Sequence, residues 1–398
     1  MPSVFVFMVS VFLPSIFLLA ICLSSQAVLA RDFVPTSDAV VVEKLSPRID
    51  SKKPMRDSMQ SSTQLLTRSG ALADSRVGLA ISQAKQLIVM AKKTADPRYL
   101  GRAQATLMPW WDDIKAPAEV AVLKATVQQS RHEFDAARAT LKRMLDMDPS
   151  QAQGWLTLAT LERLSGNYEL ALQACEKVMS ASSYALACRL ETNSMLGQTV
   201  QARDGFAALI KSAPDVQSQA WFHSLLAESQ ERAGQDASAL KSYRASIALS
   251  PDTYTALALS DLLLRNEKFA QALLVLAQEP LSDAVLIRRA YAYKQLNNPL
   301  WETLRDELYE RFAALKARGD DERLHARELA LAALWLADDG VKALPIAQTN
   351  LELQKEPFDW WLVMAAADKA KQPLLVKKFF ALARKTKLHD ARLYGFEQ

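Results

Sequence analysis

Apolar and small residues recur along this chain at the spacing of helices that pack in pairs. The clearest pair lies within residues 152–179, where Gly166 separates two stretches of helical periodicity. The apolar and small positions are Trp155, Leu158 and Ala159 in the first stretch, and Tyr168, Ala171 and Cys175 in the second. This pattern predicts an antiparallel helical hairpin. Ala159 and Ala171 are expected where the two helices cross most closely, since only a small side chain fits there.

The hairpin pattern repeats along the chain. Ala125 and Ala159 lie 34 residues apart, a period typical of two-helix repeats. The equivalent positions in earlier units are Ala125, Phe134, Ala137, Leu141 and Pro149, preceded by Ala91, Leu100, Ala103 and Leu107. Those in later units are Gly197, Ala202, Phe206 and Pro214, then Ala227, Gly234, Ala239, Tyr243 and Pro251, then Leu259, Phe269, Ala272 and Leu276. Each repeat of this kind buries its apolar face against its neighbours, which predicts a solenoid.

These units resemble the tetratricopeptide repeat, whose pattern is an aromatic residue, Leu-Ala, Gly-x-Tyr, Ala and a closing Pro. Residues 155–183 match it, with Ser183 in place of the closing Pro. The stretches DPRYLGRAQATLMPWW and HEFDAARATL are similar to a group of secreted bacterial repeat proteins. The resemblance implies an all-α, right-handed superhelical solenoid of about eight helical hairpins. Its well-defined array is expected at residues 76–282, and degenerate repeats are expected at 283–398.

The start of the chain differs from the repeats. Residues 1–30 contain no charged side chain and end in small residues, as in an export signal cleaved near Ala30. The alternative is an uncleaved inner-membrane anchor, because the apolar run is long enough to span a bilayer. The basic residues that follow it could then leave the repeats in the cytoplasm. Residues 31–75 are rich in Ser and poor in apolar positions, which predicts an extended or disordered leader.

Composition and charge limit the classes of function. The net charge of +4 comes from 48 basic and 44 acidic residues, with no basic cluster interleaved with aromatics, so nucleic-acid binding is not expected. The sequence has neither a GxSxG motif nor a Gly-rich phosphate loop. The four histidines, which lie in different units without metal-ligand spacing, are His132, His223, His325 and His389. We therefore expect no cofactor, no metal and no enzymatic activity.

Two cysteines fall on neighbouring predicted helices. Cys175 is expected on the second helix of one repeat and Cys188 on the first helix of the next. In an oxidising compartment they would form a disulfide across the repeat junction, contributing about 3 kcal/mol by constraining the unfolded chain. The alternative is a pair of buried free thiols in small core positions. The disulfide depends on export.

The resemblance also implies where a partner binds, because in this family the first helix of each repeat builds the concave face. The inward positions are Gln129, Thr160, Arg163, Tyr184, Glu191, Trp221, Glu231, Arg232, Tyr254, Asp261 and Arg265. Aromatic side chains mixed with both signs of charge suit a peptide or a helix of another protein. The Lys and Asn set with which some family members hold a C-terminal carboxylate does not occur, so that activity is not implied.

The predicted function is therefore that of an exported scaffold for protein–protein interactions or complex assembly, periplasmic or secreted. One alternative is an anchored adaptor that faces the cytoplasm, and contact with a membrane is expected only if residues 1–30 are retained. The alternative from another class is an accessory or regulatory subunit of an envelope enzyme or transporter. Such a subunit would use the same groove but would change the turnover of its partner.

Overall fold

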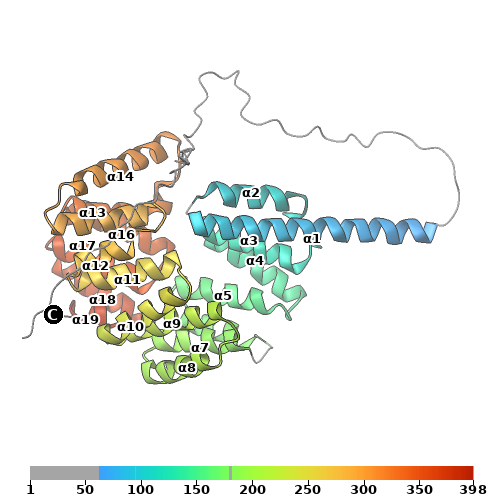
Figure 1. The fold of residues 1–398 in the computed structure, drawn as a ribbon, viewed down its shortest axis with the longest axis horizontal. Helices are drawn as coiled ribbons and strands as arrows, with labels where there is room; N and C mark the ends of the chain where they lie inside the picture. Colours follow the sequence, from blue (N-terminus) through green and yellow to red (C-terminus); the bar gives the residue numbers. More distant parts are fainter. Residues whose placement is uncertain (1–61, 95, 179–181, 398) are drawn as a thin grey trace, which may run out of the picture. The chain divides into compact units, whose positions relative to one another are not determined.

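The computed structural model describes residues 62–94, 96–178 and 182–397, together with side chains from residue 75 onwards in these ranges. The predicted export signal and residues 31–61 of the predicted leader lie outside the described residues. All regular elements of the described part are helices (Figure 1). The first ten are α1 (Ser62–Thr94), α2 (Arg98–Leu107), α3 (Ala118–Ser130), α4 (Phe134–Met147), α5 (Ala152–Leu164), α6 (Tyr168–Glu176), α7 (Ser183–Met195), α8 (Thr199–Lys211), α9 (Val216–Arg232) and α10 (Asp236–Leu249).

The remaining helices continue the same alternation to the end of the described chain. They are α11 (Thr253–Arg265), α12 (Phe269–Val275), α13 (Asp283–Gln295), α14 (Leu300–Ala317), α15 (Ala326–Leu331), α16 (Gly340–Leu353), α17 (Pro357–Lys369), α18 (Pro373–Lys385) and the short α19 (Ala391–Tyr394). A π-helical turn, Ala332–Leu336, extends α15. Consecutive helices pack as hairpins from α1/α2 to α17/α18, so the pairing persists through the region where the sequence pattern weakens.

A left-handed residue marks the turn inside each hairpin from α3/α4 onwards. These residues, all with positive φ, are His132, Gly166, Gly197, Gly234, Glu267, Asn297, Asp338 and Lys371. Gly adopts this conformation without steric penalty, whereas the side-chain-bearing residues adopt it at some cost. The same backbone turn therefore occurs in hairpins whose sequences lack the Gly signal.

The predicted packing of the clearest repeat is confirmed. Ala159 and Ala171 are fully buried, and Leu158, Tyr168 and Cys175 are buried around them. Equivalent alanine pairs in two other hairpins are also fully buried, namely Ala125 with Ala137 in α3/α4 and Ala227 with Ala239 in α9/α10. Small residues at these positions let the two helices of a hairpin approach closely while larger side chains fill the spaces on either side. The all-α solenoid predicted from the sequence is thus the fold of the described residues.

The first helix is longer than the sequence pattern indicates. It begins at Ser62, well before residue 76, where the array was expected to start. Residues 62–75 contain no proline, and their Leu, Gln, Arg and Ala residues favour helix, so they continue the helix backwards into the predicted leader. The expectation of an extended leader is therefore wrong for residues 62–75.

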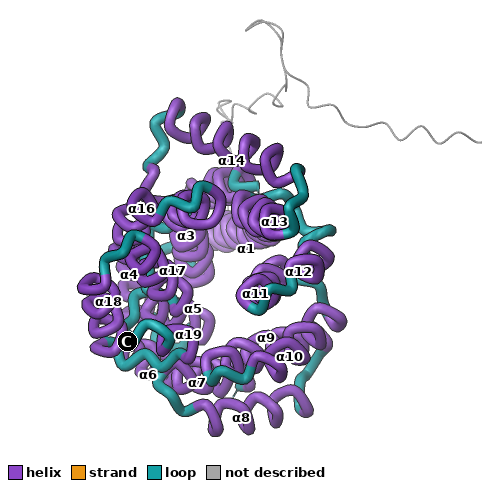
Figure 2. Tube along the Cα trace, turned by 90° about the vertical axis from the view of Figure 1, so that its left-hand side faces the viewer, coloured by secondary structure: helices purple, strands orange, loops and turns teal. Residues whose placement is uncertain are grey.

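The end of the chain returns to the early repeats. The Lys355 backbone N–H donates to the Leu164 carbonyl at 2.7 Å, and the His389 N–H donates to the Met195 carbonyl at 2.8 Å. Residues 386–394, here called the C-terminal strip, run past the turns that follow α5, α7 and α9. The short helix α19 packs against α9 and α17. Figure 2 shows α7 and α9 on the inner side and α8 and α10 on the outer side. The strip therefore covers the turn ends of these inner helices.

The C-terminal strip makes one glycine a sensitive probe of this contact. Gly197 has a φ of +88°, and an added Cβ would lie 2.9 Å from Cγ of His389. Gly319 has a φ of +76° with open space around it, so Gly319→Ala is a matched control. Both changes are expected to cost about 1–2 kcal/mol for the left-handed backbone. Gly197→Ala should cost about 1–3 kcal/mol more because its methyl group overpacks against His389.

Denaturant unfolding of both variants tests this prediction. In a His389→Ala background the ring that meets the new methyl group is absent, so the additional loss at Gly197 should disappear. Equal losses of unfolding free energy at Gly197 and Gly319 in the parent background would mean that the C-terminal strip does not pack against the turn after α7.

Candidate functional site

The inner helices α5, α7, α9 and α11 place most of the predicted binding residues in two layers. The turn layer is defined by the last turns of these helices, beside the C-terminal strip. The aromatic layer is defined by Tyr184, Trp221 and Tyr254, near the starts of α7, α9 and α11. Each of these three rings lies 13 residues before the left-handed residue of its own hairpin, so the repeat geometry carries all three to equivalent positions.

Charged residues of the turn layer are used in contacts between repeats. Arg163 is buried, and its Nη2 lies 2.9 Å from Oε2 of Glu191 on the next inner helix. The same guanidinium donates to the hydroxyls of Thr160 at 3.1 Å and Thr192 at 3.4 Å. Buried Arg232 donates to Oγ of Ser194 at 2.6 Å, which joins α9 to α7. These predicted binding residues therefore hold neighbouring repeats together.

Glu231 is the centre of a second group in the turn layer. Its buried Oε1 lies 2.6 Å from Nη1 of Arg265 on α11 and 3.3 Å from Nη1 of Arg392 in the C-terminal strip. Its Oε2 accepts a hydrogen bond from the Tyr243 hydroxyl at 2.9 Å. Arg265 also binds Asp236 at 2.9 Å. Glu231 and Arg265 thus connect two repeats to each other and to the end of the chain.

Two further predicted residues, Asp261 and Gln129, lie apart from the aromatic layer and from the group around Glu231. Asp261 accepts two hydrogen bonds from Arg288, both at 2.7 Å, which links α11 to α13. Gln129 lies half-buried in the last turn of α3. Neither residue belongs to the aromatic layer.

The aromatic layer is the part of the predicted surface that remains open. The exposed fractions are 40% for Tyr184, 38% for Trp221 and 57% for Tyr254. Tyr184 and Trp221 stack, with ring centroids 5.6 Å apart and planes 27° from parallel. Fully buried Phe222 lies against Trp221 at a centroid distance of 5.3 Å, so the indole rests on the core. Exposed aromatic rings that pack against a buried core are typical of surfaces that bind another protein.

Glu228 lies between the two layers on α9 and was not among the predicted residues. Its side chain is 14% exposed, and its Oε2 lies 3.5 Å from Nη1 of Arg232. Its Oε1 is buried and accepts no hydrogen bond from the described residues. The pKa of this carboxyl is raised from 4.5 to about 7. Burial is the main cause and the Glu191 and Glu356 charges add to it, while the Arg232 charge and a hydrogen bond from the Tyr254 hydroxyl oppose the rise. The Glu228 charge and burial in turn raise the pKa of the Tyr254 phenol well above its usual value.

The repeat spacing contained a signal for Glu228. The residues six positions before the left-handed turn residue of each unit are Thr160, Glu191, Glu228 and Asp261. Three of these positions were among the predicted inward residues. Counting six residues back from the turn residue in every unit would have identified Glu228 as well. The prediction for α9 instead named Glu231 and Arg232, which lie one helical turn later.

The two cysteines lie at a repeat junction. A disulfide joins Cys175 on α6 to Cys188 on α7, with the Cα atoms 5.7 Å apart. The bond lies in the core formed by α3 to α7, behind the inner face. It links the second helix of one repeat to the first helix of the next.

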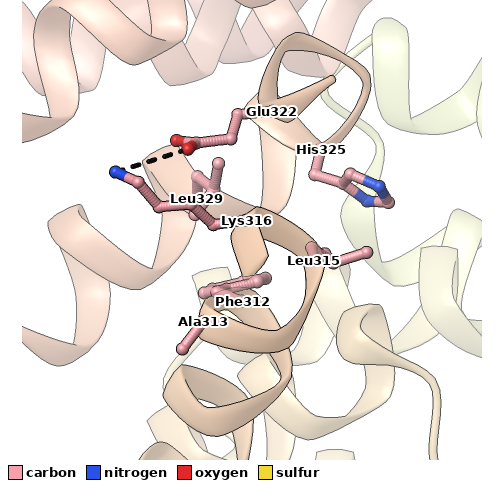
Figure 3. Close-up of a pocket in the computed structure, with 7 residues that line it drawn as sticks. All are labelled: Phe312, Ala313, Leu315, Lys316, Glu322, His325 and Leu329. Carbon is pink, nitrogen blue, oxygen red and sulfur yellow. Dashed lines mark ion pairs between the residues drawn. The ribbon is translucent and has the colours of Figure 1, made fainter. Parts of the chain in front are cut away.

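A small cavity of about 170 Å³ lies between α14 and α15, away from both layers (Figure 3). Its lining residues are Phe312, Ala313, Leu315, Lys316, Glu322, His325 and Leu329. Lys316 and Glu322 form an exposed ion pair at 3.5 Å beside it. None of the predicted binding residues contributes to this cavity.

Two properties of the described residues concern metals and membranes. No three His, Cys, Asp or Glu side chains in this part of the chain are grouped so that they could hold a metal ion. Within the same ranges, no helix combines the length and apolar character needed to cross a membrane.

Solved structures match the fold, whereas no protein-family model and no curated protein matches the sequence. A Rap protein complexed with competence and sporulation factor is 9% identical, with 85% of this chain and 88% of that chain covered and a TM-score of 0.50. The Cut9-Hcn1 hetero-tetramer of APC/C is 14% identical, with 77% of this chain and 59% of that chain covered and a TM-score of 0.47. A tetratricopeptide repeat protein from Parabacteroides merdae is 16% identical, with 63% of this chain and 99% of that chain covered and a TM-score of 0.39.

At these identities the likeness concerns the fold alone. The described chain is an all-α solenoid of helical hairpins with the tetratricopeptide-repeat fold, as its repeat pattern, alanine crossings and regular turns indicate. This fold presents a surface made of side chains from several repeats.

The raised pKa of Glu228 predicts a pH dependence of stability. Because its folded pKa of about 7 exceeds its ordinary value of 4.5, the folded state holds this proton more tightly than the unfolded state. The resulting stabilisation is fully present below about pH 4.5 and is lost as the pH rises through about 7. Glu228→Gln removes the titration. Urea unfolding from about pH 5 to about pH 8 should therefore show the variant gaining stability relative to the parent, and a difference that does not change with pH would contradict the assignment.

Proposed function

We propose that this chain is an exported scaffold that holds another protein through its aromatic layer. The observation that carries the proposal is the exposure of one ring at the same position in three consecutive inner helices, at Tyr184, Trp221 and Tyr254. Tyr and Trp are enriched among the residues that dominate binding energy at interfaces. The turn layer beside them is occupied by contacts that hold the repeats together, so the aromatic layer is the part of the inner face available to a partner.

The export part of the proposal rests on two separate features. Residues 1–30 have the uncharged, small-ended character of a cleaved export signal. Cys175 and Cys188 form a disulfide, a bond that persists in oxidising compartments such as a bacterial periplasm and is rare in a reducing cytosol. Together they favour a periplasmic or secreted location, after cleavage near Ala30, over an anchor with the repeats in the cytoplasm.

A photo-crosslinking residue tests the binding surface. Placed at Trp221 in the native host, it should capture a defined partner protein. Tyr309, on the outer helix α14, has the same exposed fraction of 38% and is the matched control position. Tyr184→Ala with Tyr254→Ala should reduce the capture at position 221 and weaken the affinity for the purified partner about tenfold or more.

The control variant Tyr309→Ala should leave that affinity unchanged. Circular dichroism should be nearly the same for all variants, because the rings of the aromatic layer are partly exposed. If positions 221 and 309 capture the same proteins with the same yield, the partner does not bind at the aromatic layer.

Intact-mass measurement tests the export proposal. Protein taken from the native envelope is expected to have the mass of residues 31–398, and reduction should increase that mass by two hydrogens as the Cys175–Cys188 bond opens. A mass that includes residues 1–30 would favour the anchor, and a mass unchanged by reduction would mean that the thiols are free in the cell.

A further inference from the structure

Helix α1 has one side packed against the array and one side open to solvent. Its packed side contacts α2 and α3. The buried positions on that side are Ala80, Ile81, Ala84, Ile88 and Ala91. With 33 residues, α1 is about 50 Å long, and Figure 1 shows its first half extending beyond α2. Because α1 is the first helix of the described array, no described repeat packs against its opposite side.

Apolar side chains are exposed on the open side of α1. The exposed fractions are 61% for Leu79, 58% for Val89 and 36% for Met90. Leu79 and Met90 are eleven residues apart, which is about three helical turns, so they lie on one line along the helix. Exposed Gln83 and Gln86 lie between them. These apolar side chains therefore project singly from the helix and do not form one continuous patch.

The open side of α1 is also positively charged. The described side chains of this helix include four basic ones and no acidic one. Lys85 is paired with Glu119 of α3. Arg76, Lys92 and Lys93 are exposed and form no ion pair with the described residues. An exposed helix face that combines apolar and basic side chains is typical of helices that lie on a membrane surface, because the long basic side chains reach past the apolar ones to the headgroups.

The outer face of α1 is defined here by Arg76, Leu79, Val89, Met90, Lys92 and Lys93. We propose that this face rests on a membrane surface that contains anionic lipid. Its basic groups contact the lipid phosphates, and its apolar side chains enter the boundary between the headgroups and the acyl chains. The contact is peripheral. The inference goes beyond the proposed function, because it places the scaffold at a membrane without the use of residues 1–30.

The spacing of the outer face favours a lipid surface over an acidic protein. Protein interfaces are closely packed around clustered anchors. Leu79 and Val89 are ten residues apart, which is about 15 Å along the helix, with polar side chains between them. A bilayer surface accommodates apolar side chains spaced in this way, since each one can enter among the lipids separately. The part of α1 that extends beyond α2 also leaves its outer face free to lie along a flat surface.

Vesicle binding tests the inference. The protein used is the chain of residues 31–398, so that the apolar run of residues 1–30 cannot contribute. It should sediment with vesicles made of equal parts phosphatidylcholine and phosphatidylglycerol, and it should not sediment with vesicles of phosphatidylcholine alone. The binding should weaken as the salt concentration rises from about 0.1 M to about 1 M, because salt screens the attraction between the basic side chains and the lipid charges.

Paired lysine variants locate the membrane contact. Lys92→Gln with Lys93→Gln should weaken binding to the mixed vesicles by about fivefold for each lysine. The matched control is Lys377→Gln with Lys378→Gln, because these adjacent lysines are also exposed, on α18, and should contribute little to binding. Circular dichroism of the variants checks the fold, since lysines in the last turn also stabilise α1 itself.

A leucine variant tests the apolar part of the contact. Leu79→Gln should weaken binding by about fivefold or more, because it removes an apolar group that enters the membrane. Leu374, which is 81% exposed on α18, provides the control Leu374→Gln, for which binding should be nearly unchanged.

Two results would overturn the inference. The first is a failure to bind the mixed vesicles, and a photo-crosslinker at Val89 that then captures one acidic protein would assign the outer face of α1 to a protein. The second is an equal loss for the α1 and α18 variants, because the attraction would then come from the overall charge of the chain. Tyr184→Ala with Tyr254→Ala should not change vesicle binding, so the test of the aromatic layer remains separate.

Discussion

The close crossing of the two helices in each hairpin fixes every other position in the array. At Ala159 and Ala171 both side chains are fully buried and no larger than a methyl group, so the helices approach until their backbones limit the contact. Once the crossing and the turn are fixed, a residue at a given distance before the turn lies on the same face of the first helix in every hairpin. The open rings and the row of carboxyls on the inner helices are consequences of that geometry, because they lie at constant distances before the turn.

The α7/α8 hairpin keeps the crossing with different residues. Leu190 occupies the position that Ala159 holds in the unit before it, and Gly205 on α8 provides the missing space. A Cβ at Gly205 would lie 2.6 Å from Leu190 Cδ1, so the glycine is required by packing against the leucine. Volume is conserved across the pair although each residue departs from the repeat pattern. Exchanges of this kind weaken a sequence signal while leaving the backbone arrangement unchanged.

The fold could be predicted from the sequence further than the site could. Hairpins with Gly166, Gly197 and Gly234 at the turn are visible in the sequence, whereas those with Glu267 or Lys371 have the same left-handed backbone without that signal. Helical periodicity still indicated their existence, and only their frames were uncertain.

Site residues were harder to predict because their roles depend on distant partners. Arg163, Glu231 and Arg265 lie in the last turns of α5, α9 and α11. Glu231 binds Arg392, which lies 161 residues away, and no local spacing predicts that the end of the chain returns to α9. A buried carboxylate that loses such partners strongly destabilises the fold. These ion pairs therefore stabilise the packing of the repeats. The sequence pattern assigned these residues to the first helices of the repeats but could not separate those that hold the repeats together from those left exposed.

The carboxyl of Glu228, which is ion-paired with Arg232, is held in place by the same packing that fixes the repeats. Ala227, its neighbour in the chain, is fully buried at the crossing of α9 with α10, and Phe222 on the same helix is also fully buried. A rotation of α9 large enough to expose Glu228 to water would pull both from the core and would break the contact of Arg232 with Ser194. The loss of that packing outweighs the gain from hydrating one carboxyl oxygen, since each large buried side chain contributes more than a single hydrogen bond. The free chain therefore retains a poorly satisfied acceptor at Oε1 of Glu228, close to the exposed ring of Tyr254.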